Sequence, residues 1–375
     1  MKYFLLFLRI AIGVLFIYSG ILKANDPLGL VYKMDEFFDA LNMPFMVHMS
    51  FVFSVFMIAL EIVCGVAVLI GFSFNIFATI LLLLNLFFLF ITGYALFTGK
   101  VKECGCFGTC VKISNTMTFY KDIVLSIVSI VLFIYRKRVQ DMFPKFINVA
   151  IFLLAIVFAA GAEWYTLRHL PFYDCMPYKA GFNLWKKMQP GSDYKPPVVQ
   201  STFIYEKNGE KKEFTMENYP WQDSTWKFVD RKDKIISEAM GEPEIHDFIL
   251  NDSNHVDQTE QILTAKGYTF LWFVRNLDQP HLDNMDKLAN IAAKATTLHI
   301  PFYILSSSYD SSKAILSRNN MGNLPIFTLD GTASRTAMRT NPGLMLLKDG
   351  VVQQKWSYAD YPAEMTLNGD KLDIK

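Results

Sequence analysis

The stretch RIAIGVLFIYSGILKANDP, residues 9–27, decides the fold class of the first half of the chain. It belongs to an apolar run over roughly 3–23, and about 20 mostly apolar residues are enough for a helix to cross a bilayer. The run is too long for the apolar part of a secretory signal, and it lacks a small-residue cleavage pattern. The sequence therefore predicts a helix that stays in the membrane.

Four further apolar segments match the first in length: roughly 46–71, 74–97, 118–135 and 146–166. The chain is 52% hydrophobic with 33 Phe, and the apolar excess is concentrated before residue 167. A soluble helical core is the alternative, which so many long runs in succession disfavour. We expect an α-helical bundle in a lipid bilayer. The net charge of +1 provides no basic field that would attract nucleic acid.

The loop YRKRVQDMFPK, residues 135–145, sets the expected orientation. It carries four basic residues and one acid: Arg136, Lys137, Arg138, Lys145 and Asp141. Short loops rich in Lys and Arg stay in the cytoplasm, which places the N-terminus inside and everything after about residue 167 outside. The loop 98–117 is also fairly basic and falls on the outer side. The predicted location is the inner (cytoplasmic) membrane of a bacterium, with the C-terminal domain in the periplasm.

The segment VKECGCFGTCVK, residues 101–112, holds three cysteines on one short loop: Cys104, Cys106 and Cys110. Cys175 follows the fifth helix, so these thiols lie on the side of the membrane where disulfides persist. Cys64, within the second helix, is expected to pack as a small apolar residue.

Three interpretations of the cysteine loop remain open. As a redox site, Cys104 and Cys106 close a very small ring that is strained against the preferred disulfide geometry, and strained, exposed disulfides are the labile and catalytic ones. Cys110 then supplies a third thiol for exchange, and Cys175 is a further candidate. As a structural site, two disulfides staple the loop and tether the linker at 167–178 to the bundle. As a metal site, three thiolates plus Cys175 or His169 would hold zinc, but the spacing of the cysteines is unusual for that, and we expect no metal.

Two ionisable residues lie inside apolar runs, Arg9 in the first helix and Glu61 in the second. Such residues are costly in lipid and usually face a partner within the bundle. At about 1.5 Å per residue, Arg9 lies roughly 9 Å and Glu61 roughly 15 Å from the cytoplasmic side, a difference that an arginine side chain spans. We predict that they form an ion pair. A structural role and a proton- or quinone-related role are both open.

Three motifs together resemble a known membrane family. They are the opening stretch at 9–27, ALEIVCGVAVLIG at 59–71 and CGCFG at 104–108. Over residues 1–140 the chain resembles the DoxX-like family, in particular the branch that includes the methylamine-utilisation protein MauE. This resemblance implies a four-helix bundle, to which the fifth helix at 141–167 is an addition.

The same resemblance implies a function. Members are linked to quinone-coupled oxidation or, for MauE, to disulfide formation in a maturing periplasmic partner. It therefore implies a redox role for Cys104 and Cys106, a quinone as the candidate cofactor and an envelope protein as the client. It names neither the client nor the electron acceptor.

The external half begins with a membrane-proximal linker, 168–242, which contains alternating strands around Asn208-Gly209, a strong hairpin signal. Residues 243–375 then read strand–helix–strand–helix–strand–strand, which predicts an α/β domain with a mixed sheet. Over about 243–360 this order resembles a thioredoxin-like domain of the envelope type. Within RTNPGLMLLKDG the resemblance implies that Pro342 is cis.

The position that holds Cys-x-x-Cys in such domains reads NLDQPHLDN, residues 276–284, with no cysteine. The domain therefore cannot carry out dithiol chemistry with its own residues, and His281 in this segment is expected to be a solvated surface group. Two classes of function remain. One is a membrane oxidoreductase that passes electrons between envelope thiols and the quinone pool. The other is a non-catalytic envelope scaffold with structural disulfides, whose thioredoxin-like module binds partner chains.

Overall fold

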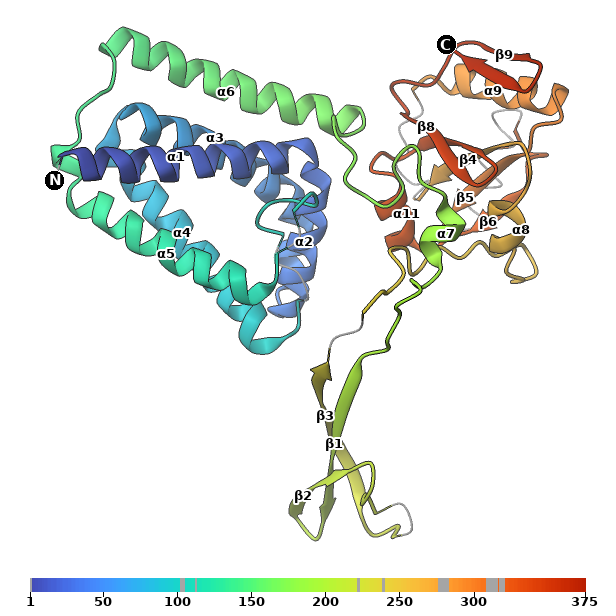
Figure 1. The fold of residues 1–375 in the computed structure, drawn as a ribbon, viewed down its shortest axis with the longest axis horizontal. Helices are drawn as coiled ribbons and strands as arrows, with labels where there is room; N and C mark the ends of the chain where they lie inside the picture. Colours follow the sequence, from blue (N-terminus) through green and yellow to red (C-terminus); the bar gives the residue numbers. More distant parts are fainter. Residues whose placement is uncertain are drawn as a thin grey trace.

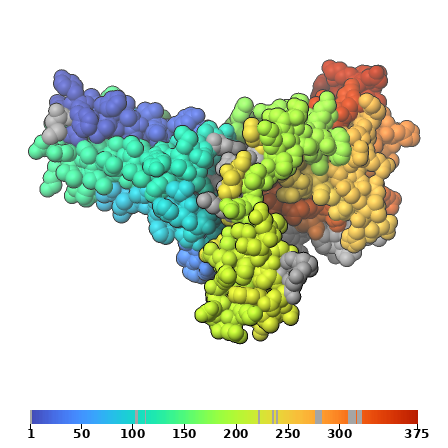
Figure 2. Space-filling view, turned by 60° about the horizontal axis from the view of Figure 1, so that its bottom comes forward, coloured from blue at the N-terminus to red at the C-terminus, as the bar shows by residue number. Residues whose placement is uncertain are grey.

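The computed structural model describes residues 2–101, 105–111, 113–220, 223–237, 240–275, 283–307, 316 and 321–375. Figure 1 shows a helical bundle, an α/β domain beyond one end of it, and a long β-arm that projects sideways from the junction. In the space-filling view the arm stands out between these two bodies (Figure 2).

Five helices in the described part of the chain are long and apolar enough to cross a membrane. They are α1 (Lys2–Asn25), α3 (Ser50–Ile70), α4 (Phe74–Thr98), α5 (Asn115–Ile134) and α6 (Lys145–Arg168). Short 3-10 helices precede α3 and follow α5: η1 (Pro44–Met49) and η2 (Arg136–Arg138). The predicted spans are thus confirmed as helices, and the chain is a membrane protein.

Polar contacts identify the two ends of the bundle. At one end the Met142 N–H donates to the Ile70 carbonyl at 2.8 Å, which brings the α5–α6 loop beside the end of α3. At the other end the Thr166 hydroxyl donates to the Ala24 carbonyl at 2.8 Å. The cysteine loop and the start of the C-terminal half therefore share one end of the bundle, and the basic loop at 135–145 lies at the opposite end.

Between α1 and η1 lies the amphipathic helix α2 (Pro27–Ala40). Asp26 caps it by accepting the Gly29 N–H at 3.2 Å, and Pro27 occupies the first helical position, where its missing N–H costs nothing. Met34 and Phe37 are buried, so the apolar face of α2 covers the end of the bundle that carries the cysteine loop.

The packing of α1 on α3 overturns the predicted Arg9–Glu61 ion pair. A Cβ added at Gly13 would lie 3.0 Å from the Gly65 carbonyl oxygen, so the helices approach closely there. In this register Arg9 lies level with Gly71, at the end of α3. The N-terminal end of α1 extends about 10 Å past the end of α3. The prediction assumed that the two helices begin at the same membrane depth, so it placed Arg9 too close to Glu61. The Arg9 guanidinium instead donates to the Gln140 carbonyl at 3.0 Å.

The arm is an antiparallel sheet in the order β2-β1-β3. Its strands are β1 (Val198–Lys207), β2 (Glu210–Thr215) and β3 (Lys227–Ser237). Asn208 and Gly209 both have positive φ, 53° and 84°, as a two-residue type I′ hairpin turn requires. The predicted hairpin is therefore confirmed.

The α/β domain has a mixed sheet in the order β6-β5-β4-β7-β8. Its strands are β4 (Tyr268–Val274), β5 (Phe302–Ser306), β6 (Ile326–Thr328), β7 (Gly343–Lys348) and β8 (Val351–Ser357). The first three run parallel, and β7 and β8 are antiparallel to their neighbours. A central strand flanked by a parallel strand on one side and an antiparallel hairpin on the other is the thioredoxin-like arrangement that the sequence predicted.

Helices and a terminal hairpin cover the two faces of this sheet. One core lies under α9 (Met285–Thr297) and the unpredicted hairpin β9 (Met365–Asn368) with β10 (Lys371–Ile374). The other lies under α7 (Leu184–Met188), α8 (Thr259–Leu263) and α11 (Gly331–Ala337). Because α7 packs into this core, part of the expected linker belongs physically to the domain.

The Asn341–Pro342 peptide bond is cis, as predicted. The Arg275 N–H, at the end of β4, donates to Asn341 Oδ1 at 2.9 Å, so the proline lies beside the start of the segment that replaces Cys-x-x-Cys. Residues 276–282, which include His281, lie outside the described residues.

Candidate functional site

The cysteine loop folds back onto the C-terminal end of α1. Gly105 and Gly108 have φ of 69° and 66°, which favours glycine, and the Gly108 N–H donates to the Gly105 carbonyl at 2.9 Å. A Cβ at Gly108 would lie 3.1 Å from the Leu22 carbonyl oxygen. This tight turn holds the half-buried Cys106 against α1, whereas Cys104 lies outside the described residues.

Beneath the loop, Glu61 forms an ion pair with Lys23, with Nζ and Oε1 2.5 Å apart and side chains only 3% and 2% exposed. The Ser19 hydroxyl lies 3.0 Å from Glu61 Oε2 and 3.0 Å from the Cys106 carbonyl oxygen. A hydroxyl donates one proton, so Ser19 can serve either acceptor. Lys23, rather than Arg9, is thus the partner of Glu61. The Ser19 hydroxyl lies between this ion pair and the cysteine loop.

Two small internal cavities of about 20 Å³ each adjoin Cys106, Lys23 and Glu61. A cavity needs roughly 10–15 Å³ of such volume to hold one water. One of the two also reaches the Lys121–Asp122 pair, whose Nζ and Oδ1 are 3.0 Å apart. Each cavity therefore has room for about one water beside charged groups, deep in an apolar bundle.

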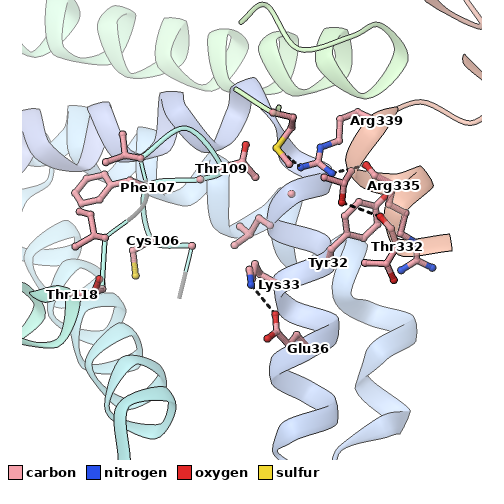
Figure 3. Close-up of a pocket in the computed structure, with 18 residues that line it drawn as sticks. Tyr32, Lys33, Glu36, Cys106, Phe107, Thr109, Thr118, Thr332, Arg335 and Arg339 are labelled. Atoms are coloured by element: carbon pink, nitrogen blue, oxygen red, sulfur yellow. Dashed lines mark hydrogen bonds and ion pairs between the residues drawn. The ribbon is translucent and has the colours of Figure 1, made fainter. Parts of the chain in front are cut away.

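A larger cleft of about 500 Å³ lies beside the same loop, between α2 and α11 (Figure 3). Its walls carry charged, aromatic and hydroxyl side chains, including Tyr32, Lys33, Glu36, Phe107, Thr109, Thr332, Arg335 and Arg339. Cys106 lines this cleft and both internal cavities. The thiol therefore lies where an external ligand and the interior of the bundle meet.

Asp26 fastens the α/β domain to the bundle at this cleft. Its Oδ2 accepts the Arg339 Nε–H at 3.0 Å and the Thr109 hydroxyl at 2.8 Å. Asp26 and Arg339 are both buried. Since Arg339 precedes Pro342 closely and Thr109 belongs to the cysteine loop, this carboxylate joins the cis-proline segment to that loop.

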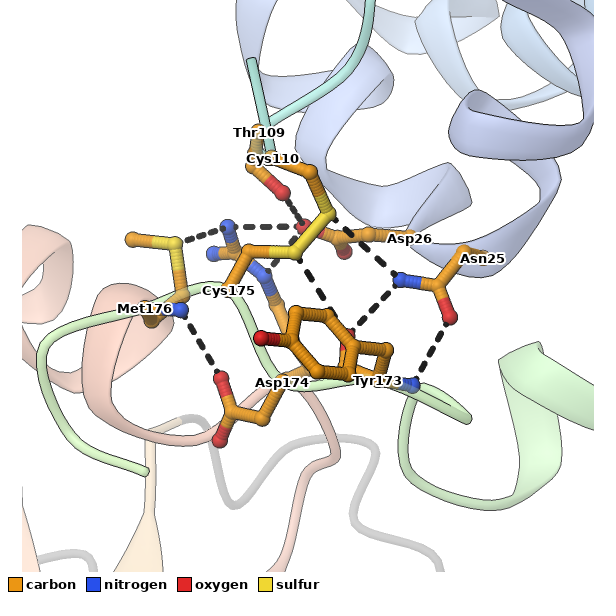
Figure 4. Close-up of a disulfide and its surroundings, with 9 residues drawn as sticks. Asn25, Asp26, Thr109, Cys110, Tyr173, Asp174, Cys175 and Met176 are labelled. Carbon is orange, nitrogen blue, oxygen red and sulfur yellow. Dashed lines mark hydrogen bonds and ion pairs between the residues drawn. A yellow bond between two sulfur atoms is a disulfide. The ribbon is translucent and has the colours of Figure 1, made fainter. Parts of the chain in front are cut away.

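Cys110 and Cys175 form a disulfide, with Cα atoms 4.9 Å apart (Figure 4). Beside it, the Asn25 side chain donates to the Tyr173 carbonyl at 2.8 Å and accepts the Tyr173 N–H at 3.0 Å. The disulfide tethers the linker to the cysteine loop, and Asn25 tethers it to α1. The structural interpretation expected such a tether without naming which cysteines pair. The bond also uses two of the thiolates that a zinc site would need.

Sequence reasoning missed several residues of this site. Lys23 was taken as the end of an apolar run, although α1 continues to Asn25. Asp26 before Pro27 is a helix-start signal that would have revealed α2. Cys64 is buried as expected, with its thiol directed at the Phe77 carbonyl at 3.7 Å.

Comparison with known proteins adds three findings. Curated proteins give no match. A family described as "Domain of unknown function (DUF8463)" matches residues 199–238, which form most of the arm. A solved structure of a secreted Mycobacterium tuberculosis disulfide oxidoreductase, described as homologous to E. coli DsbE, is 16% identical, with 29% of this chain and 81% of that chain covered and a TM-score of 0.24. The thioredoxin-like assignment therefore depends on the strand order alone.

The family match to the membrane bundle agrees with the motifs at its helix ends and cysteine loop. Residues 1–135 match the family "Methylamine utilisation protein MauE".

Proposed function

We propose that this protein catalyses thiol–disulfide exchange at the membrane surface, with Cys104 and Cys106 as the reactive pair and an envelope protein as the client. The observation that carries the proposal is the position of Cys106, which lines the outer cleft and both internal cavities. A cysteine there can react with a polypeptide that enters the cleft. Its carbonyl oxygen lies 3.0 Å from the Ser19 hydroxyl, on the side of the bundle interior.

The proposed reaction is an exchange between two dithiol–disulfide couples. A client thiolate attacks one sulfur of the Cys104–Cys106 disulfide and forms a mixed disulfide, and the second client thiolate then displaces the protein thiolate. The client gains one disulfide and loses two protons and two electrons, while Cys104 and Cys106 become two thiols. No other oxidant is needed for one turnover.

Ser19, Glu61 and Lys23 serve this reaction as positioning residues. The buried Lys23–Glu61 pair lies beneath the loop. When the Ser19 hydroxyl donates to the Cys106 carbonyl rather than to Glu61, it restrains the backbone of the reactive residue within a glycine-rich loop.

Each internal cavity beside Cys106 has about 20 Å³, which admits roughly one water and no quinone ring. The cleft of about 500 Å³ also reaches Cys106, so a quinone as the electron acceptor stays a prediction. The proposed exchange itself needs only protein thiols.

We propose that the cleft faces the periplasm. The opposite end of the bundle carries the basic residues Arg136, Lys137 and Arg138, and Arg9 bonds to the loop at that end. Positive charge favours the cytoplasmic side. The disulfide-bonded end would then lie in the compartment where disulfides persist.

A non-catalytic scaffold is the second candidate, and the Cys110–Cys175 tether favours it. Thiol trapping in intact cells separates the two. The redox proposal expects Cys110 and Cys175 to resist a maleimide reagent, and Cys104 and Cys106 to appear in mixed states that become reduced when a dithiol client accumulates. Permanent oxidation of all four thiols would support the scaffold.

A further inference from the structure

The cleft beside Cys106 has an unbalanced positive charge at its outer wall. Arg335 and Arg339, carried by α11 and the segment after it, lie over the Tyr32 ring, with their guanidinium carbons 5.0 and 5.7 Å from its centroid. Figure 3 shows both arginines next to Tyr32, on the side of the cleft that faces the α/β domain. Two cations therefore lie close to the same aromatic ring of α2.

A third arginine lies behind them. Arg275 donates to the Met338 carbonyl at 2.8 Å, at the end of the segment that leads to Arg339. Burial lowers the pKa of its guanidinium, Tyr32 acts in the opposite direction, and the charges of Arg335 and Arg339 lower the pKa further. Three guanidinium groups thus repel one another around Tyr32.

The nearby carboxylates do not balance this cluster. Asp26 pairs with Arg339, and Glu36 pairs with Lys33 at 2.8 Å. In the part of the chain that the structure describes, no carboxylate forms an ion pair with Arg335. Its planar group of N–H donors is therefore available to an anion that enters the cleft.

We propose that the cleft binds an extended client segment that carries an acidic side chain near its cysteine, with Arg335 as the residue that recognises the acid. The inference rests on the proposed function, since Cys106 at the base of the cleft selects a polypeptide with a thiol. A volume of about 500 Å³ lies within the usual range of ligand sites, roughly 300–1,000 Å³. Arg335 is a specificity residue and takes no part in the exchange itself.

Binding can be tested without any thiol chemistry. The full-length protein in nanodiscs of phosphatidylcholine is titrated with a fluorescent pentapeptide that has serine in place of cysteine and one glutamate beside it. A second peptide has glutamine in place of the glutamate. We expect the acidic peptide to bind about tenfold more tightly, as one charge-assisted hydrogen bond provides, and expect added salt to weaken this preference.

Arg335→Gln should remove the preference, so that both peptides bind equally. Arg335→Lys should keep part of it, because the charge remains while the fork of donors is lost. The matched control is Arg231→Gln on the arm, whose guanidinium pairs with Asp233 at 2.7 Å in solvent; it should leave the preference unchanged.

Equal binding of the two peptides by the unaltered protein would overturn the inference, as would an Arg335→Gln variant that still discriminates. If phosphatidylglycerol in the nanodisc displaces the acidic peptide from the cleft, the anion is a lipid headgroup and the assignment to a client is wrong. Cys106→Ser should retain the preference. A protein that discriminates between the peptides but shows no exchange would therefore leave this inference standing while the proposed function fails.

Discussion

Lys23 and Glu61 form an ion pair inside the membrane bundle, with both side chains at least 97% buried and Nζ within 2.5 Å of Oε1. Removing one partner of a buried pair leaves an uncompensated charge, which costs about 3 kcal/mol or more. We expect Glu61→Gln to lower the thermal unfolding midpoint in detergent strongly, and expect the double variant with Lys23→Met to recover most of the loss.

The Lys33–Glu36 pair is the matched control, because it joins half-exposed side chains on α2. Lys33→Met should change stability by less than about 1 kcal/mol, as surface pairs do. If Glu61→Gln proves as mild as Lys33→Met, the buried pair does not exist in the folded protein.

The Cys110–Cys175 bond closes a loop with a sequence separation of 65 residues. A cross-link of that span stabilises a folded chain by about 4 kcal/mol in the chain-entropy model. We expect Cys175→Ser to lower the unfolding midpoint while exchange at Cys106 continues at temperatures where the variant is folded. Loss of exchange in the folded variant would place this disulfide in the reaction route rather than in a tether.

Asp26 serves as a helix cap and as a bridge between the bundle and the α/β domain. Asp26→Ala should lose about 1 kcal/mol from the cap and a further 3 kcal/mol or so from the unpaired Arg339. Protease digestion at the linker should then be faster than in the unaltered protein. Asp39→Ala, an exposed acid on the same helix, is the control, and an equal digestion rate in the two variants would contradict the bridge.

Asp330 caps α11, the helix that carries Arg335. Hydrogen bonds from the Ala333 and Thr332 N–H groups lower the pKa of its carboxyl below the usual 3.8. A depressed pKa means that the stabilisation is complete above about pH 5 and is lost as the pH falls through the folded-state pKa. We therefore measure the unfolding midpoints of the unaltered protein and of Asp330→Ala between pH 5 and pH 3. The two midpoints should converge as the pH falls.

Asp330→Asn keeps the capping acceptor and does not titrate. Its midpoint should not approach that of Asp330→Ala as the pH falls. A constant difference between the unfolding midpoints of the unaltered protein and Asp330→Ala over this range would contradict the prediction. It would show that ionisation of the Asp330 carboxyl adds no stability at the cap of α11.

The sequence predicted those parts of the fold that local patterns specify. The long apolar runs gave the spans, Asn208-Gly209 gave the hairpin, and the order of strands with Pro342 gave the thioredoxin-like domain. These signals need only the length of a run, a turn that requires positive φ, or the order of elements along the chain.

The parts that failed depend on how elements pack. The Arg9–Glu61 prediction was wrong because the stagger of α1 on α3 is set by the close approach at Gly13 and Gly65, which depth counting ignores. The Asp26–Arg339 bridge joins residues 313 positions apart, so no local pattern could reveal it. The same is true of the cleft, whose walls come from opposite ends of the chain.

The proposed exchange at Cys106 can be measured in a single turnover. The purified protein is oxidised, freed of oxidant, mixed with a dithiol peptide in vesicles, and the peptide disulfide is followed by mass spectrometry. We predict one peptide disulfide per chain from the unaltered protein and from Cys64→Ser, whose buried thiol lies within a span, and none from Cys106→Ser. A Cys106→Ser variant that oxidises the peptide at the unaltered rate would contradict the account.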